Sequence, residues 1–361
     1  MAKLLRGYED DRTPVQHSSD IFKEHLRNFS LTKLLGRKDS GMPIITDSKI
    51  KGNAGDTIVY HFIPQNKTDG LYGQDGTMTG NEETLDEFLD KISINQIRKG
   101  FKKKGKLTDK RLVWDARKEF KTQLHNWFTD RDNIWVHAAL TGYMYNGFDF
   151  LKGAAKAETA LVNGEGRCVA ANKSAKFKLV APEQTSDNEV LTQLTNADII
   201  NTYLLDELSI IAKQGNSKYR IAPVKMSNGK EMFFLLLDMK AARDLRQDAR
   251  FDKHALSLVE AGISPDKDPF VSGAIGIWQN LIILEDEYIS HVKNENVDVA
   301  RNLLLGANAC AMLWAQTTDY IEEYSDYHNE FGVVADEIRG QKKLCFDGVD
   351  VGVMQVLTAV N

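Results

Sequence analysis

Residues 108–142 read TDKRLVWDARKEFKTQLHNWFTDRDNIWVHAALTG. Apolar side chains recur here at the spacing of one face of an amphipathic helix; they are Val113, Ala116, Phe120, Leu124, Trp127, Phe128, Trp135 and Ala138. Thr108 is a favourable N-cap and Gly142 a favourable C-cap. Such a helix would span about 50 Å, whereas helices average only about 11 or 12 residues. The stretch therefore predicts a structural spine, with Trp127 buried against neighbouring strands.

A long β-hairpin is predicted before this helix. Residues Thr57–Ile63 (TIVYHFI) are rich in β-branched and aromatic side chains, and alternating apolar residues predict a second strand over Thr84–Phe101. Between them, Gly70–Gly80 contains four glycines, which is typical of a flexible loop. We expect the hairpin to project, and its tip to become ordered only against another molecule. The main apolar side chains of the tip are Leu71, Tyr72 and Met78.

The rest of the chain predicts an α+β protein with discontinuous domains. Residues 1–53 are charged, with helical spacing only over Ile21–Leu35, and predict an arm that depends on partners for its order. Helices are predicted over Asn196–Gln214, Met239–Gln247 and part of the alanine- and leucine-rich Val299–Ala315. Extended stretches are predicted at Arg220–Val224 and Met232–Leu237, around an Asn228-Gly229 turn, and at Ile275–Leu284, Gly332–Phe346 and Val349–Val360.

The composition is that of a globular protein from a reducing compartment. Hydrophobic residues make up 42% of the 361 residues, enough for a sizeable core, and the net charge of −5 argues against a dedicated nucleic-acid binder. The three cysteines have neither disulfide-framework nor metal-ligand spacing; they are Cys168, Cys310 and Cys345. Residues 1–20 do not fit a signal peptide, and the longest apolar run, Met232–Leu237, is too short for a membrane span. We therefore expect a protein made in a cytoplasm.

No residue pattern predicts catalysis, a cofactor or a metal site. His125 lacks the glutamate spacing of a zinc protease, and the glycines after Gly70 lack the lysine of a P-loop. The acidic run 285–287 could bind a cation, but a solvated strand end is the simpler interpretation. Glu337 and Arg339 lie on one face of a predicted strand, where they could pair within or between subunits. We expect a protein that is not an enzyme.

The strongest charge feature is the basic segment, residues 98–111. Its cations are Arg98, Lys99, Lys102, Lys103, Lys104, Lys106, Lys110 and Arg111, against one carboxylate, Asp109. Three interpretations stay open: a solvated loop, a charge patch between subunits, and a contact with nucleic acid. The segment has no ladder of aromatic residues on which single-stranded bases could stack, which weakens the third interpretation.

The order of these elements resembles the major capsid protein fold of tailed bacteriophages. Short motifs resemble the branch found in short-tailed phages and related prophages, and together the likeness covers about residues 51–360. These motifs are Gly55-Asp56-Thr57, Thr79-Gly80-Asn81-Glu82-Glu83, Lys104-Gly105-Lys106-Leu107-Thr108, Ala222-Pro223-Val224, Asn228-Gly229-Lys230, Asp244-Leu245-Arg246, Phe270-Val271-Ser272-Gly273-Ala274-Ile275-Gly276-Ile277, Leu304-Leu305-Gly306-Ala307-Asn308-Ala309, Asn329-Glu330-Phe331-Gly332 and Asp336-Glu337-Ile338-Arg339-Gly340.

The resemblance implies five regions of the chain. They are an N-terminal arm (residues 1–50), an extended hairpin called the E-loop (51–104), a peripheral domain with the spine helix (105–190), an axial domain (191–254), and a return through the strands of both domains (255–361). It also implies self-assembly as pentamers and hexamers into an icosahedral head that encloses double-stranded DNA. The E-loop would lie across a neighbouring subunit, and the axial domains would gather around the five-fold and six-fold centres.

The implied partners are other copies of the chain, portal and scaffolding proteins, and DNA on the inner face, with no membrane; a decoration protein is left open. The protein would be assembled in the host bacterial cytoplasm and reside in the virion. Our candidates for contacts between subunits or with DNA are Leu71, Tyr72, Met78, Arg98, Lys99, Lys102, Lys103, Lys104, Lys106, Glu337 and Arg339. Two rival functions are a DNA-binding protein that uses the basic segment, and an enzyme with a concave pocket of perturbed titratable groups.

Overall fold

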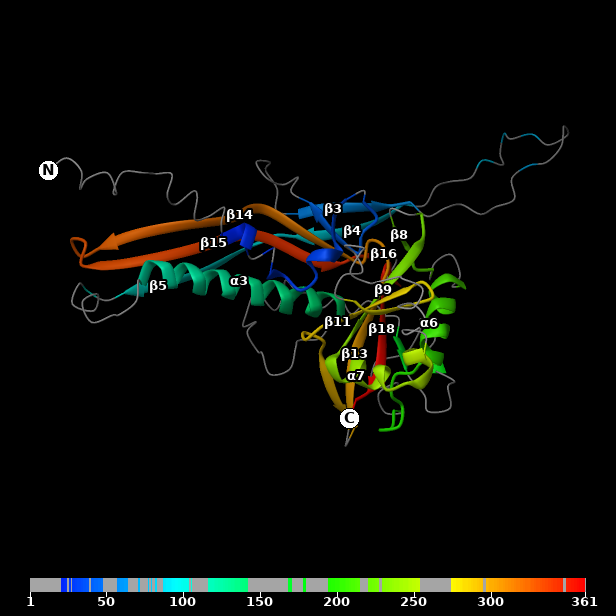
Figure 1. Cartoon of the computed structure of the whole chain (residues 1–361). Coiled ribbons are helices and arrows are strands. Elements are labelled where there is room, and N and C mark those ends of the chain that lie inside the picture. Colours follow the sequence, from blue (N-terminus) through cyan, green and yellow to red (C-terminus); the bar gives the residue numbers. More distant parts are fainter. Residues whose placement is uncertain are drawn as a thin grey trace.

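The computed structural model describes residues 21–24, 26, 28–38, 40–47, 57–63, 71, 77, 79, 82, 87–103, 105, 116–141, 168–170, 178–179, 194–214, 220–226, 229–253, 274–294, 297–346 and 349–360. These residues form an elongated half, which is a β-ribbon lined by one long helix, and a compact half built on a large sheet (Figure 1). No helix in the described ranges is long and apolar enough to cross a membrane.

The elongated half contains a five-stranded sheet and helix α3 (Ala116–Thr141). The strand order is β1 (Leu35–Arg37), β2 (Ile44–Asp47), β14 (Cys310–Ser325), β15 (Glu330–Lys343) and β5 (Asn95–Lys103). β14 and β15 form an antiparallel hairpin, and β5 pairs with the part of β15 nearest the turn. Helix α3 lies along this ribbon, and its 26 residues give a length of about 39 Å (Figure 1).

Helix α3 confirms the predicted spine helix, but the prediction of which side chain it buries against the ribbon is wrong. Phe128 is fully buried among residues of β14 and β15, whereas the neighbouring Trp127 is only partly buried and packs at the edge of this cluster. The prediction that Trp127 is a buried anchor is therefore wrong, because the helix turns the adjacent residue toward the ribbon. The predicted caps of the helix, Thr108 and Gly142, lie outside the described residues.

The compact half is built on a nine-stranded mixed sheet. Its main path is β10 (Ala274–Trp278), β11 (Leu281–Glu285), β9 (Glu231–Leu237), β13 (Val297–Leu305), β18 (Val353–Ala359), β6 (Cys168–Ala170) and β7 (Lys178–Leu179), while β12 (His291–Asn294) pairs with β13 and β8 (Val224–Lys225) with β9. Helices α6 (Thr202–Gln214) and α7 (Met239–Arg246) contribute to the same hydrophobic cluster as the sheet. Strand β9 has six consecutive buried residues, as expected for a strand covered on both faces.

The alanine- and leucine-rich stretch Val299–Ala315 is not helical as predicted. It forms most of β13, a turn in which Asn308 has a positive φ of 58°, and the start of β14. These strands lie within sheets that are covered on both faces, so apolar residues run almost continuously, interrupted only by Arg301, Asn302 and Asn308, and no alternation marks the stretch as strands. Burial in the sheet outweighs the intrinsic preference of alanine and leucine for helices.

Helix α6 begins at Thr202, later than the predicted Asn196. The Asp198 carboxylate accepts hydrogen bonds of 2.7 Å from both the N–H and the hydroxyl of Thr195, which closes a turn ahead of the helix. Asn201 Oδ1 then accepts a 2.9 Å hydrogen bond from Leu204 N–H and caps the first helical turn. The predicted α7, the hairpin of β8 and β9, and the strands near residues 275–284, 332–346 and 349–360 are confirmed.

The described part of the N-terminal arm is built into the subunit. The short 3-10 helix η1 (Thr32–Leu34) leads into β1, which pairs in parallel with β2, and β2 pairs in parallel with β14. Phe29, Leu31 and Ile44 are buried in the main hydrophobic cluster. The prediction that residues 1–53 depend on partners for their order is therefore wrong for residues 28–47.

The predicted hairpin is confirmed in part. Strand β3 (Thr57–Phe62) pairs antiparallel with β4 (Phe88–Ser93) over six residues. The second arm does not continue to Phe101 as one strand, because the chain leaves β4 at Ile94 and β5 then pairs with β15. Of the predicted apolar tip, Leu71 is described and exposed, while Tyr72 and Met78 lie outside the described residues. A further small sheet pairs β16 (Cys345–Phe346) with β17 (Val349–Asp350).

Candidate assembly surfaces

The root of the β3–β4 hairpin is packed into the elongated half. Tyr60 of β3 and Ile92 of β4 are both almost fully buried. They belong to one hydrophobic cluster with Ile45, Ala311, Leu313 and Leu344, which come from β2, β14 and the end of β15. The hairpin is therefore held at its base by side chains from several strands, and its direction relative to the ribbon is determined within the subunit.

Polar contacts and one glycine position the same root. The buried Asp90 carboxylate pairs with Lys342 Nζ and accepts a 3.0 Å hydrogen bond from Cys345 N–H. At Gly340 of β15 the chain between β4 and β5 crosses so closely that an added Cβ would lie 2.2 Å from the carbonyl oxygen of Ser93. Only glycine fits this crossing, because the opposing atom belongs to the backbone.

We expect Gly340→Ala to destabilise the subunit by about 1–3 kcal/mol, since the β4–β5 crossing must move away from β15. Gly332→Ala is the matched control on the same strand, because its added Cβ would meet no atom closer than 3.7 Å. Chemical denaturation of both variants measures the difference. Equal stabilities would show that the close crossing does not constrain the hairpin.

Beyond its root, the hairpin exposes apolar side chains. Phe62 is 40% exposed, Leu89 53% and Ile63 57%, and Leu71 further along the loop is 45% exposed. Leu89 and His61 are paired across the hairpin, as are Phe62 and Phe88. Large exposed apolar side chains on one short element mark a candidate interaction surface.

The described part of the basic segment is strand β5, so the interpretation as a solvated loop is wrong for residues 98–103. Alternation divides its cations between the two faces of the sheet. Lys99 lies on the α3 side, with its Nζ 5.7 Å from the ring centroids of both Phe101 and Trp127. Lys102 is exposed on the other face and pairs with Glu330. Lys104 and Lys106 lie outside the described residues.

Glu337 and Arg339 are buried inside the subunit rather than placed at its surface. Arg339 Nη1 contacts the Asp132 carboxylate of α3 and lies 3.3 Å from Glu337 Oε2. The Thr318 hydroxyl donates a 2.5 Å hydrogen bond to Glu337 Oε1. The predicted pairing thus occurs within the subunit, and neither residue is available for a contact with another subunit or with DNA.

The β14–β15 turn presents the most exposed aromatic side chain in the described ranges. Asp326, Tyr327 and His328 all have positive φ, between 49° and 63°, which non-glycine residues rarely adopt. Tyr327 is fully exposed at this turn, at the far end of the ribbon (Figure 1). The sequence does not predict this feature, because a tyrosine between Asp326 and His328 is not a recognisable signal for an exposed tip.

The described residues contain no group of three or more His, Cys, Asp or Glu side chains that could hold a metal ion. Burial raises the pKa of the Cys310 thiol to about 12, and burial together with Asp350 raises the pKa of Cys345. Both thiols therefore stay protonated near neutral pH and behave as core residues rather than nucleophiles. Within the acidic run 285–287, Asp286 is buried, so the predicted solvated strand end is wrong at that position.

Comparison with known proteins identifies the family. A family model described as phage capsid protein matches residues 7–361. The major capsid protein of Pseudomonas phage KPP25 is 26% identical over 314 residues, which cover 81% of this chain and 80% of that protein. The capsid of Ralstonia phage GP4 superposes with a TM-score of 0.73 at 20% identity, covering 91% of this chain and 90% of that one. The cyanophage Pam1 capsid gives 0.70 at 19% identity, covering 93% of both chains.

These likenesses confirm the predicted capsid fold, and they give no support to the rival hypothesis of a dedicated DNA-binding protein. The family match spans nearly the whole chain, including the hairpin root and the ribbon described above. This chain therefore belongs to the phage capsid protein family.

Proposed function

We propose that the chain is the major shell subunit of a tailed-phage head, which assembles as pentamers and hexamers into an icosahedral shell around double-stranded DNA. Portal and scaffolding proteins would take part in assembly in the cytoplasm of the host bacterium. Family membership supports the capsid role, and symmetric repetition of modest interfaces would supply the energy of the shell.

The observation that carries the mechanism is the contrast between the two ends of the hairpin. Its root is buried and held by Asp90 and Gly340, whereas its flank exposes Phe62, Ile63 and Leu89. A root held within the subunit, with exposed apolar side chains beside it, is suited to bind a second subunit, because little conformational freedom of the root would be lost on binding. The hairpin would therefore lie across a neighbouring copy.

The face of the ribbon opposite α3 is a candidate binding surface for the hairpin of a neighbouring subunit. Register places Ile321, which is 49% exposed, beside Val334, and Val334 beside Gly100 of β5. Gly100 has no side chain, and Val334 fills the space above it, since an added Cβ there would lie 2.8 Å from Val334 Cγ2. A neighbour's Leu89 would find an apolar surface there.

The cations and carboxylates flanking this row support the interpretation of the basic segment as a patch between subunits. Exposed Asp319 and Glu323 lie on β14, while exposed Arg98 and Lys102 lie on β5 at the opposite edge. A neighbouring copy could place its Asp319 and Glu323 against Arg98 and Lys102. Such a charge contact would determine the orientation of the two subunits more than it would increase their affinity for each other. A contact of the same cations with packaged DNA stays a second prediction.

The test of the proposed function replaces residues 70–80 with an Asn-Gly turn. We expect the subunit to remain folded by circular dichroism, because residues 70–80 have few apolar side chains in the sequence, and to elute as a small species without closed shells in electron microscopy. A control variant, Leu71→Ser with Tyr72→Ser, keeps the loop length and removes its apolar groups, and it should weaken assembly in the same direction. Shells of normal size and stability from the shortened protein would refute the interlocking role of the hairpin.

A further inference from the structure

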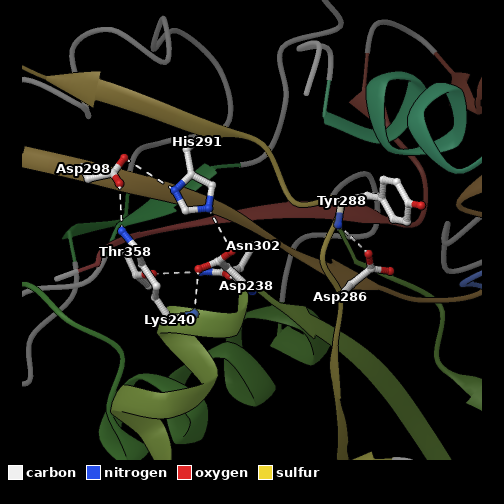
Figure 2. Close-up of polar contacts among 8 residues, drawn as sticks. All are labelled: Asp238, Lys240, Asp286, Tyr288, His291, Asp298, Asn302 and Thr358. Carbon is white, nitrogen blue, oxygen red and sulfur yellow. Dashed lines mark hydrogen bonds and ion pairs between the residues drawn. The ribbon is translucent and has the colours of Figure 1, made fainter. Parts of the chain in front are cut away.

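Two histidine–aspartate pairs, one buried and one partly buried, bracket residues 286–291, which run from the end of β11 to the first residue of β12. At its start, Asp286 Oδ2 lies 3.2 Å from Nε2 of His137, a residue of α3. At its end, His291 Nε2 lies 2.8 Å from Asp238 Oδ1, the N-cap of α7 (Figure 2). The first pair joins the elongated half to the compact half, and the second ties the same segment into the compact half.

The surroundings of His137 require both ring nitrogens to be engaged. Nδ1 lies 2.7 Å from the backbone carbonyl of Asn133, so it donates, and Nε2 faces the Asp286 carboxylate. The side chains of His137 and Asp286 are only 2% and 3% exposed. Asp286 also accepts hydrogen bonds from Tyr288 N–H, at 2.9 Å, and from the side chain of Ser30. An imidazole with an acceptor at each nitrogen is best satisfied when it carries both protons.

Few other charged groups act on this pair. The ring of Tyr288 lies 5.8 Å from that of His137, and the carboxylates of Asp130 and Glu287 act on Tyr288 from α3 and from the segment itself. The charge that acts directly on His137 is that of Asp286, and it favours the protonated imidazole. Ser30, from the N-terminal region, is the remaining polar neighbour, and its N–H donates to Asn133 Oδ1 at 2.9 Å.

The surroundings of His291 are also acidic. Its Nδ1 lies 3.5 Å from Asp298 Oδ1 on β13, and Lys240 Nζ of α7 lies 3.3 Å from the other oxygen of Asp298. Asp238 additionally accepts from Lys240 N–H at 2.8 Å, and its own N–H donates to Asn302 Oδ1 at 2.9 Å (Figure 2). Each histidine thus faces carboxylates that are already held in place by backbone hydrogen bonds.

We propose that residues 286–291 form a proton-dependent clasp that holds helix α3 against the compact half, closed while His137 and His291 are protonated and loosened when these protons are lost. The clasp is a property of the single subunit and does not rest on the proposed mechanism of assembly. It lies where α3 meets the large sheet, so its state determines how firmly the two halves are joined.

The pH dependence follows from the sign of each shift. Burial lowers the pKa of His137, but Asp286 and the Asn133 carbonyl outweigh it, so the pKa is raised above its ordinary 6.5. The hydrogen bond to Asp238 raises the pKa of His291 as well. A raised histidine pKa stabilises the folded state fully below about pH 6.5, and this contribution is lost as pH rises through the folded-state pKa. The clasp should therefore open on the alkaline side.

The test is hydrogen exchange of the isolated full chain, measured between about pH 6 and about pH 9 and corrected for intrinsic rates. We expect the backbone amides of residues 281–294 and 134–141 to be less protected as pH rises. The equilibrium constant for local opening should increase by about tenfold for each unit by which the histidine pKa is raised. His137→Gln should show weaker protection with a reduced pH dependence. His61→Gln is the matched control, because His61 pairs with Glu87 on the exposed hairpin.

Protection that does not change over this range in the wild type, or an unchanged pH dependence in His137→Gln, would overturn the clasp. If His137→Gln does not fold, the pKa of His137 is measured in the wild-type chain by following the NMR resonances of its imidazole ring. A titration of His137 above its ordinary pKa supports the proposal, and one at or below it refutes the proposal.

Discussion

Replacing Phe128 by alanine should lower the free energy of unfolding of the isolated subunit by about 3–5 kcal/mol. Phe128 is fully buried where α3 packs on the ribbon, in a cluster with Leu124, Tyr320 and Val333. Removing the ring leaves a cavity between a helix and a sheet that are both rigid, so the site cannot collapse around it. Chemical denaturation followed by circular dichroism measures the loss.

Trp127→Ala is the matched control, because it removes a larger ring from the adjacent position. The Trp127 ring is only partly buried, packs edge-on against Phe128 with centroids 5.0 Å apart, and has Arg131 above it at 5.1 Å. We expect a smaller loss of about 1–2 kcal/mol from reduced burial and a lost cation–π contact. A loss as large as that of Phe128→Ala would mean that the helix face has been assigned wrongly.

Replacing Arg339 by methionine should be comparably severe, with a loss of about 3–5 kcal/mol. The change leaves two carboxylates, Asp132 and Glu337, buried without the cation that both contact. The guanidinium carbon also lies 5.0 Å from the Trp135 ring centroid, and methionine retains part of that packing. The expected loss is therefore mainly electrostatic, and denaturation at neutral pH measures it.

Two further variants separate this explanation from simple loss of packing. Replacing Asp132 and Glu337 by leucine together with Arg339→Met should restore much of the stability, because no unpaired charge remains buried. Arg246→Met breaks the exposed pair with Glu285 and should cost less than about 1 kcal/mol. If the triple variant is as unstable as Arg339→Met alone, the loss comes from packing and not from unpaired charge.

The amino-acid sequence alone determined the elements whose signal is local. The helical spacing of α3, the turn residues at Gly229 and the β-branched run of β3 each reflect contacts between residues close in the chain. The order of such elements, together with short motifs, resembled the capsid fold of tailed phages, and that resemblance was enough to predict the fold.

Only the tertiary structure decided the features that depend on distant partners. Val299–Ala315 became strands because most of its side chains are buried within the two sheets, and Asp286 became buried because α3 supplies His137. The same is true of Glu337 and Arg339, whose alternation predicted a shared face but not that α3 would cover it. Periodicity reports which residues share a face, whereas burial depends on which element packs there, and that information lies in residues far away in the chain.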